Sequence, residues 1–329
     1  MGALVDSFGR VHTDLRVSLT DKCNLRCSYC MPAEGLDWLP SPELLTDDEV
    51  VRVIRIAVED LGITEVRLTG GEPLLRRGIV DIVRRLVALR PQPQLSMTTN
   101  GIGLARVVEE LAAAGLQRVN ISLDTLQHAT FVALARRDRL DDVLAALDAA
   151  RAVGLAPVKV NTVLMRGIND HEALPLLRYC LDHGFALRFI EQMPLDAQHG
   201  WDRSVMVTGE EVLERLRAEH TLTPLDGRGS SPAEEFFVDG GPATVGVIAS
   251  VSRPFCGSCD RVRLTADGQV RNCLFAREES DLRPALRGGA DDAEIAERIR
   301  VSIAGKRAGH GIDDPTFLQP DRPMSAIGG

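Results

Sequence analysis

The sequence contains very little lysine and no long apolar run. Lys22, Lys159 and Lys306 are its only lysines, and we attribute the arginine bias to the base composition of the genome. The net charge of −9 gives no basic field for nucleic acid or an anionic membrane. The opening MGALVDSFGRVHTDLR lacks an apolar signal-peptide core, and no stretch approaches the ~20 apolar residues of a membrane span. We therefore expect a cytosolic protein without a nucleic-acid or membrane partner.

Several nucleotide- and metal-binding motifs are also absent. The chain has no G-x-x-x-x-G-K-S/T loop and no H-E-x-x-H, and GIGLAR at 101–106 lacks the third glycine of a dinucleotide-binding turn. A bound nucleotide would therefore be held differently from the GTP of a GTPase. The seven cysteines are an odd number, and clustered cytosolic cysteines are more often metal ligands or catalysts than disulfides.

Strand-like runs alternate with helical segments through the first two thirds of the chain. The predicted strands span 14–20, 65–70, 94–101, 118–124, 158–165 and 186–193, and the helices between them include 46–62, 78–90, 104–115 and 140–154. Thr46 and Glu49 predict a capping box at the first helix. Regular β–α alternation indicates parallel strands with crossover helices, as a barrel or a doubly wound sheet.

The side-chain pattern within the strands favours the barrel. One parity is apolar, as at Val17 and Leu19, whereas the other is polar or small, as at Arg16 and Ser18. Strands buried on both faces would be continuously apolar, and the strands of a wet antiparallel sheet would not be separated by helices. A parallel barrel with a polar ligand in its lumen explains both features. We predict an α/β fold, an incomplete (β/α)6 TIM-like barrel over residues 1–220 with its site at the C-terminal strand ends.

The alternation stops near residue 220, so residues 221–329 are predicted to form a C-terminal extension. Segment 236–252 predicts a hairpin that turns at Gly240-Gly241, and a helix is expected near 291–303. The final DDPTFLQPDRPMSAIGG suggests an extended segment.

A first group of cysteines follows directly on the first predicted strand. Cys23, Cys27 and Cys30 have the spacing C-x₃-C-x₂-C, and His12, before the strand, is the nearest histidine. One interpretation is a structural zinc whose fourth ligand lies far away in sequence. However, zinc knuckles come as two CxxC pairs, and this loop is a triple. Three thiolates can instead hold three irons of a [4Fe–4S] cube and leave the fourth iron open.

A second group, Cys256, Cys259 and Cys273, has the spacing C-x₂-C-x₁₃-C. Taken alone, CGSC followed by RVRL favours a zinc-ribbon half-site. The remaining cysteine, Cys180, has apolar neighbours in a predicted helix and is interpreted as a core residue. Two open three-cysteine sites in one chain predict two clusters, each with one iron facing a shared cavity.

DKCNLRCSYC at 21–30 resembles the signature of radical S-adenosylmethionine (SAM) enzymes, and GGEP at 70–73 matches their second motif. In that family SAM is the missing ligand, and the cluster's electron releases a 5′-deoxyadenosyl radical from it. The full set of motifs resembles the MoaA family, the GTP 3′,8-cyclases of molybdenum-cofactor biosynthesis. The resemblance covers LRVSLTDKCNLRCSYCMP, RLTGGEPLLRR, TTNG, NISLDTL, VKVNTVLMRGIND, RFIEQMPL, the second cysteine group and the terminal Gly-Gly.

This resemblance implies two [4Fe–4S] clusters, SAM and a defined reaction. The radical takes hydrogen from the ribose C3′ of GTP, and the C3′ radical attacks guanine C8. The product is (8S)-3′,8-cyclo-7,8-dihydroguanosine 5′-triphosphate. Guanine is implied to bind the open iron of the second cluster, and the terminal Gly328-Gly329 to reach into the active site as catalytic residues.

The resemblance also implies binding roles for individual residues. Independently of it, several cations on the lumen parity require a polyanion, because buried unpaired charge is very costly and arginine suits phosphate oxygens. The implied cluster ligands are Cys23, Cys27 and Cys30, and Cys256, Cys259 and Cys273. The implied SAM contacts are Tyr29, Gly71, Ser122 and Met193. The implied GTP contacts are Arg16, Arg67, Thr98, Lys159, Arg261, Val262 and Arg263.

Two other interpretations remain open at this point. A different radical SAM enzyme with an auxiliary cluster, such as a peptide-modifying one, would lack the Arg-x-Arg after CGSC and the terminal Gly-Gly. A non-catalytic zinc or iron–sulfur sensor would not cleave SAM. The expected partners of a cyclase are GTP, an unidentified electron donor and the downstream cyclic pyranopterin monophosphate synthase, and a homodimer is a further expectation.

Overall fold

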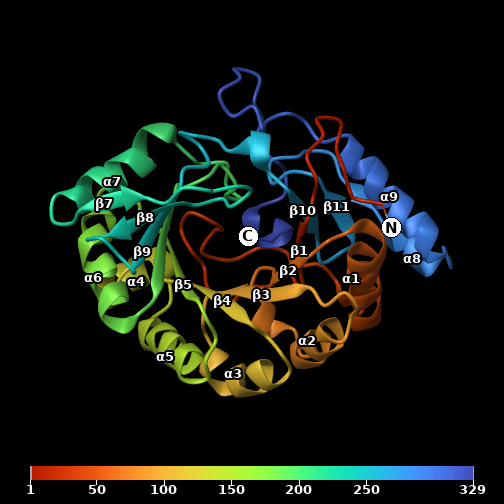
Figure 1. Cartoon of the computed structure of the whole chain (residues 1–329), viewed down its shortest axis with the longest axis horizontal. Coiled ribbons are helices and arrows are strands. Elements are labelled where there is room, and N and C mark those ends of the chain that lie inside the picture. Colours follow the sequence, from red (N-terminus) through yellow and green to blue (C-terminus); the bar gives the residue numbers. More distant parts are fainter. Residues whose placement is uncertain (1, 329) are drawn as a thin grey trace.

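A curved sheet forms a wide arc in the computed structural model, which describes residues 2–328 (Figure 1). Within these residues the strand order is β12-β11-β10-β1-β2-β3-β4-β5-β6-β9-β8-β7. The strands are β1 Asp14–Ser18, β2 Glu65–Thr69, β3 Gln94–Thr99, β4 Arg118–Ser122, β5 Val158–Val163, β6 Ala186–Ile190, β7 Leu222–Pro224, β8 Glu234–Val238, β9 Thr244–Ile248, β10 Arg261–Leu264, β11 Gln269–Arg271 and β12 Ser280–Asp281.

The helices connecting the parallel strands lie on the convex side of this arc (Figure 1). They bury apolar faces against the outward side chains of the strands, which form the main hydrophobic core. The helices are α1 Asp47–Leu61, α2 Ile79–Val87, α3 Leu104–Ala113, α4 His128–Ala135, α5 Leu140–Ala152, α6 Ala173–His183, α7 Gly209–Arg217, α8 Arg283–Arg287, α9 Asp292–Ala304 and α10 Met324–Ile327. No helix among residues 2–328 combines the length and apolar character that a membrane span requires.

The predicted six-strand unit is confirmed. Strands β1 to β6 pair in chain order and in parallel, and each predicted helix between them is present. The capping box at α1 also forms, because Thr46 Oγ1 accepts from Glu49 N at 3.1 Å and Glu49 Oε2 accepts from Thr46 N at 2.8 Å. Cys180 is buried in α6, as expected of a core residue.

The C-terminal part contributes more to the sheet than the sequence predicted. Strand β9 adds in parallel to β6 at one edge, and β10 adds in parallel to β1 at the other. Beyond them, β8 pairs antiparallel with β9, and β11 pairs antiparallel with β10. The described sheet does not close on itself. The sheet therefore continues across the predicted division at residue 220. The division into residues 1–220 and 221–329 stays a prediction.

Two details of the C-terminal part were predicted with different success. The hairpin forms between β8 and β9, where Gly240 and Gly241 adopt φ of +86° and +82° at the turn. The prediction of an extended tail is wrong at the end of the chain, because Met324–Ile327 form the helical turn α10. Figure 1 places the C-terminus inside the arc, facing the concave side of the sheet.

A buried carboxylate fixes the edge where β9 joins the barrel. Glu191 follows β6, and its carboxylate accepts the backbone N–H groups of Gly209, Val251 and Ser252, each at 2.8 Å. It thus connects β6, the start of α7 and the segment after β9. Since Gly209 and Val251 are buried, removing the carboxylate leaves their N–H groups unsatisfied.

Glu191→Ala should lower the free energy of unfolding by about 3 kcal/mol, because buried donors lose one shared acceptor. The matched control Glu210→Ala removes an exposed carboxylate next to the same helix start and should change it by less than about 0.5 kcal/mol. Urea unfolding followed by circular dichroism measures both. Equal midpoints for the two variants would contradict this role.

Candidate active site

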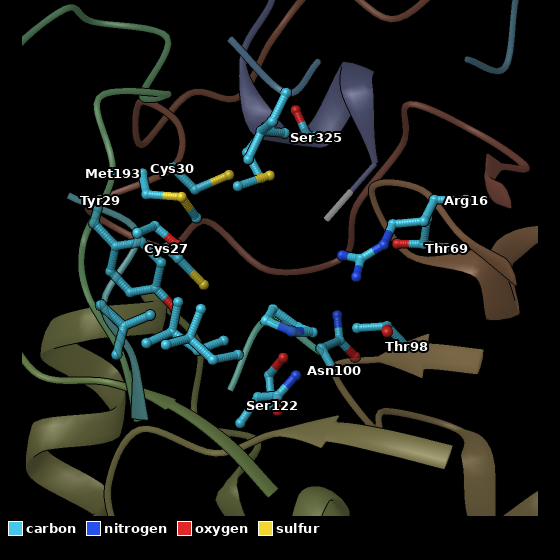
Figure 2. A pocket seen from close by; sticks show the side chains of 18 of the residues that line it. Arg16, Cys27, Tyr29, Cys30, Thr69, Thr98, Asn100, Ser122, Met193 and Ser325 are labelled. Atoms are coloured by element: carbon cyan, nitrogen blue, oxygen red, sulfur yellow. The ribbon is translucent and has the colours of Figure 1, made fainter. Parts of the chain in front are cut away.

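The concave side of the sheet encloses a large cavity. Its volume is about 350 Å³, which lies within the range of about 300–1,000 Å³ that is typical of small-molecule sites. Its walls come from the inward parity of the strands, the loop after β1, the segment between β9 and β10, and α10. Figure 2 shows the thiols of Cys27 and Cys30 on one side and Arg16 and Thr98 on the other.

The first cysteine group lies at the C-terminal end of β1, where it was predicted. The sulfur-bearing side chains of Cys23, Cys27 and Cys30 all line the cavity. The loop is held by two arginines: Arg26 Nη1 donates to Cys23 O at 2.8 Å, and Arg136 Nη1 donates to Met31 O at 2.9 Å. The loop conformation therefore rests on contacts made by the protein itself.

These thiols have the character of ligands for a positively charged group. Burial, with Cys30 and Asp124 adding to it, raises the pKa of Cys27 well above its ordinary value. Burial, followed by Cys23, raises the pKa of Cys30 to about 12. Burial has the same effect on the core residue Cys180, so the position of the thiols is the informative feature. Three thiols that line one cavity at the end of β1 fit a [4Fe–4S] cluster, whose irons would supply the compensating positive charge.

The GGEP motif packs closely against the start of the cysteine loop. A Cβ on Gly71 would lie 2.4 Å from both Asp21 O and Lys22 O, so no larger residue fits there. The next residue, Glu72, accepts from Thr99 Oγ1 and Asn100 N, both at 2.7 Å. Burial raises the pKa of Glu72 to about 7. Glu72 thus connects the ends of β2 and β3 beneath the cysteine loop.

The other predicted SAM contacts also lie at the cavity. Tyr29, Ser122 and Met193 all line it. Tyr29 Oη donates to Asp124 Oδ2 at 2.7 Å, and Asp124 Oδ1 accepts from Val163 N at 2.9 Å. Burial raises the pKa of Asp124 to about 6. The hydrogen bond fixes the tyrosine ring at the cavity wall, as Figure 2 shows.

The second cysteine group lies toward the opposite end of the strands. Cys256 and Cys259 lie in the segment that joins β9 to β10, and Cys273 follows β11; all three line the same cavity. Since Asp14 pairs with Arg261, the start of β10 is level with the start of β1. The prediction that the site lies at the C-terminal strand ends is therefore incomplete, because it describes the first group alone.

Positive charge surrounds the second group. Burial opposes ionisation of Cys259, but Arg261 and Lys306 outweigh it and hold the pKa of this thiol below its ordinary value. A thiol stabilised as thiolate is a ready metal ligand.

Three arginines lie in one row between the two cysteine groups. Arg16 on β1 pairs in register with Arg67 on β2 and with Arg263 on β10, and all three line the cavity. Burial, followed by repulsion from Arg67, lowers the pKa of Arg16 to about 10. Burial, followed by Arg16, lowers that of Arg263 to about 9. Among residues 2–328, Arg16 Nε is buried without a hydrogen-bond partner, so one donor of this row is unsatisfied.

The remaining predicted GTP contacts divide into three groups. Thr98 and Arg261 line the cavity. Lys159 lies outside the cavity lining, and burial, followed by Arg188, lowers its pKa to about 8. Val262 has its side chain in the hydrophobic core, 2% exposed, so a GTP contact at this residue would use its backbone, and it stays a prediction. Alternation along β10 turns Val262 outward because Arg261 and Arg263 point inward.

Sequence reasoning missed one cavity cation and the role of one helical turn. Arg188 on β6 lines the cavity and pairs with Glu235 at 2.8 Å. The inward parity of ALRFI was sufficient to find it. Ser325 of α10 also lines the cavity, and no periodic signal predicted that turn.

The described end of the tail contacts the arginine row, while its predicted catalytic role stays a prediction. Gly328 O accepts a hydrogen bond from Arg263 Nη1, and Gly328 has φ +89°. A Cβ on Gly328 would lie 2.9 Å from Thr69 Cγ2 and 3.1 Å from Ser18 Cβ. Gly329 lies outside the described residues.

Two protein-family models match the chain. The Radical SAM superfamily matches residues 17–180, and Molybdenum Cofactor Synthesis C matches residues 185–312. Solved structures share the fold at 14% identity. Streptococcus suis SuiB bound to S-adenosylmethionine has a TM-score of 0.62 over 91% of this chain and 69% of its own. Native anSMEcpe with bound AdoMet has a TM-score of 0.57 over 88% and 84%.

Curated relatives are much more similar in sequence. A GTP 3′,8-cyclase from Streptomyces coelicolor is 66% identical over 99% of this chain and 96% of its own length. A GTP 3′,8-cyclase from Mycolicibacterium smegmatis is 59% identical over 100% of this chain and 92% of its own. GTP 3′,8-cyclase 2 from Mycobacterium tuberculosis H37Rv is 58% identical over the same shares. The chain therefore belongs to the GTP 3′,8-cyclase family of radical SAM enzymes.

Proposed function

We propose that this protein converts GTP to (8S)-3′,8-cyclo-7,8-dihydroguanosine 5′-triphosphate in the first step of molybdenum-cofactor biosynthesis. The observation that supports this most strongly is one cavity lined by two three-cysteine groups and a row of arginines. The family and the names of the relatives agree with it. Family membership argues against a non-catalytic sensor, and full-length similarity to cyclases argues against a peptide-modifying enzyme.

Membership of the radical SAM superfamily implies a [4Fe–4S] cluster and SAM. Cys23, Cys27 and Cys30 would hold that cluster, which with SAM supplies the 5′-deoxyadenosyl radical for hydrogen abstraction at the ribose C3′. Because Gly71 has no side chain, the edge of the cavity beside it would stay open, and the amino group of SAM would bind there. Tyr29, kept in place by Asp124, would form the wall beside SAM.

Cys256, Cys259 and Cys273 would hold a second cluster whose open iron binds guanine. This assignment is wholly part of the proposal: within residues 2–328, no three His, Cys, Asp or Glu side chains are arranged to hold one metal ion. It is supported by the three thiols at one end of the cavity and by the cations around Cys259.

The arginine row would bind the triphosphate. Arg16, Arg67 and Arg263 are largely removed from water. Within residues 2–328, the carboxylate that forms an ion pair with this row is Asp14, whose Oδ2 is 3.5 Å from Arg16 Nη2, and Glu65 lies near Arg67. A triphosphate would offset this excess of positive charge and offer paired oxygens to each guanidinium. GTP held here would extend between the two cysteine groups, so that its ribose faces SAM and its base faces the second group.

The tail would close the cavity on the substrate side of SAM. Arg263 reaches both the lumen and Gly328 O, so it couples the position of the tail to the phosphate row. The electron donor, the downstream synthase that uses the product, a homodimeric state and a cytosolic location stay predictions.

The reaction itself tests the proposal. Anaerobic protein incubated with SAM, GTP and dithionite should release 5′-deoxyadenosine and the cyclic nucleotide, both detected by mass spectrometry. Cys27→Ala should release neither, because the first cluster loses a ligand, whereas Cys180→Ala, a buried cysteine away from the cavity, should release both. Deoxyadenosine without any nucleotide product from wild type would refute the cyclase assignment.

Gly328→Ala should lower the rate of cyclisation roughly a hundredfold with little change in stability, because a Cβ displaces the tail by about 1 Å. The matched control Gly311→Ala changes another glycine of left-handed conformation, at φ +70°, whose Cβ would meet nothing closer than 3.9 Å. The control should keep near-normal turnover. If both variants cyclise GTP at the wild-type rate, the tail has no catalytic role.

A further inference from the structure

A buried lysine lies directly behind the second cysteine group. Lys306 follows α9 and is 4% exposed. Its Nζ is 3.4 Å from Cys259 Sγ, 3.4 Å from Cys259 O and 2.9 Å from Arg261 O. The lysine therefore contacts both a proposed cluster ligand and the backbone that carries Arg261 into the lumen.

All the groups around this nitrogen are acceptors. Besides the thiol sulfur and two carbonyls, His12 Nδ1 lies 3.5 Å away. An ammonium has three donors and no acceptor, so it suits this surrounding without rearrangement. The other ring nitrogen, His12 Nε2, lies 3.1 Å from Asp6 Oδ2.

The N-terminal segment that contains Asp6 and Arg10 contacts the segment between β9 and β10 from the side away from the cavity. Asp6 accepts from Arg10 Nε at 2.5 Å, and Arg10 Nη1 donates to Cys256 O at 2.7 Å and to Ala308 O at 3.0 Å. Figure 1 shows this N-terminal segment alongside the C-terminal strands and α9. Cys256 and Cys259 are therefore both fixed by contacts from the side away from the cavity.

The ammonium of Lys306 has no carboxylate as a counter-charge within the described residues. In the described part of the chain, Lys306 makes no ion pair with a carboxylate, and the only ionisable acidic group that it contacts is the thiol of Cys259. A buried ammonium without an anion would cost several kcal/mol. The anion that this arrangement suits is the Cys259 thiolate and the cluster bound to it.

We propose that Lys306 is a positioning residue of the second cluster, donating to Cys259 Sγ and holding the Cys259 and Arg261 carbonyls. This inference rests on the proposed presence of that cluster. Positive charge and a hydrogen bond at a ligand sulfur stabilise the reduced, more negative form of a cluster. Lys306 therefore makes the second cluster easier to reduce and orients Arg261 toward the substrate.

Lys306→Met, which keeps the length but not the charge, tests this on anaerobically reconstituted protein. The midpoint potential of the second cluster, from an EPR-monitored redox titration, should become more negative. GTP binding should weaken roughly tenfold, while the potential of the first cluster stays unchanged. Lys306→Arg should restore most of the potential. Arg300→Met, which removes an α9 cation that contacts Glu297 and Asp60 O, should match wild type in both readouts.

Each other result has a distinct meaning. Unchanged potential and GTP affinity in Lys306→Met, with two clusters present, would overturn the role of Lys306 alone. Only one cluster in wild type would overturn the proposed second cluster and this inference with it. If the second cluster is lost in Lys306→Met, the variant Lys306→Arg decides. A second cluster of near-normal potential in Lys306→Arg supports the role of the positive charge. Loss of the second cluster in Lys306→Arg as well overturns that role.

Discussion

Three arginine side chains at one register of β2, β1 and β10 impose the strongest constraint on this structure. Each is largely removed from water, and Asp14 is the close carboxylate between them. Burying a single uncompensated charge costs several kcal/mol, so this row is unfavourable until an anion enters. The fold tolerates it because the outward parity of the same strands is densely packed with the surrounding helices. Stability and substrate binding thus use opposite faces of the same strands.

The pairing of β10 with β1 places the second cysteine group. That pairing brings Arg263 into the row and sets Cys259, two residues before β10, toward the N-terminal ends of the strands. Cys23 follows the C-terminal end of β1. The arginines consequently lie between the two cysteine groups in one cavity.

Local signals predicted much of this from sequence. The alternation of apolar and polar residues along the strands predicted which side chains face the lumen. The Thr46–Glu49 capping box predicted the start of α1. Alternation along β6 also places Arg188 inward, a cavity residue that was missed when residues were transferred by resemblance alone. The places of β9 and β10 at the two edges of the six-strand unit were not predictable in this way, since pairing between strands far apart in the chain, such as β1 and β10, leaves no local pattern. The turn α10 was missed because only four residues form it.

The central claim is that two clusters face one cavity, and metal content tests it most directly. Iron, acid-labile sulfide and zinc can be measured on anaerobically purified wild type and on Cys273→Ala. Since the two cysteine groups lie on separate segments, the account predicts about eight irons per chain in wild type, about four in the variant and no zinc in either. About four irons and one zinc in wild type, with the irons unchanged and the zinc lost in Cys273→Ala, would contradict it.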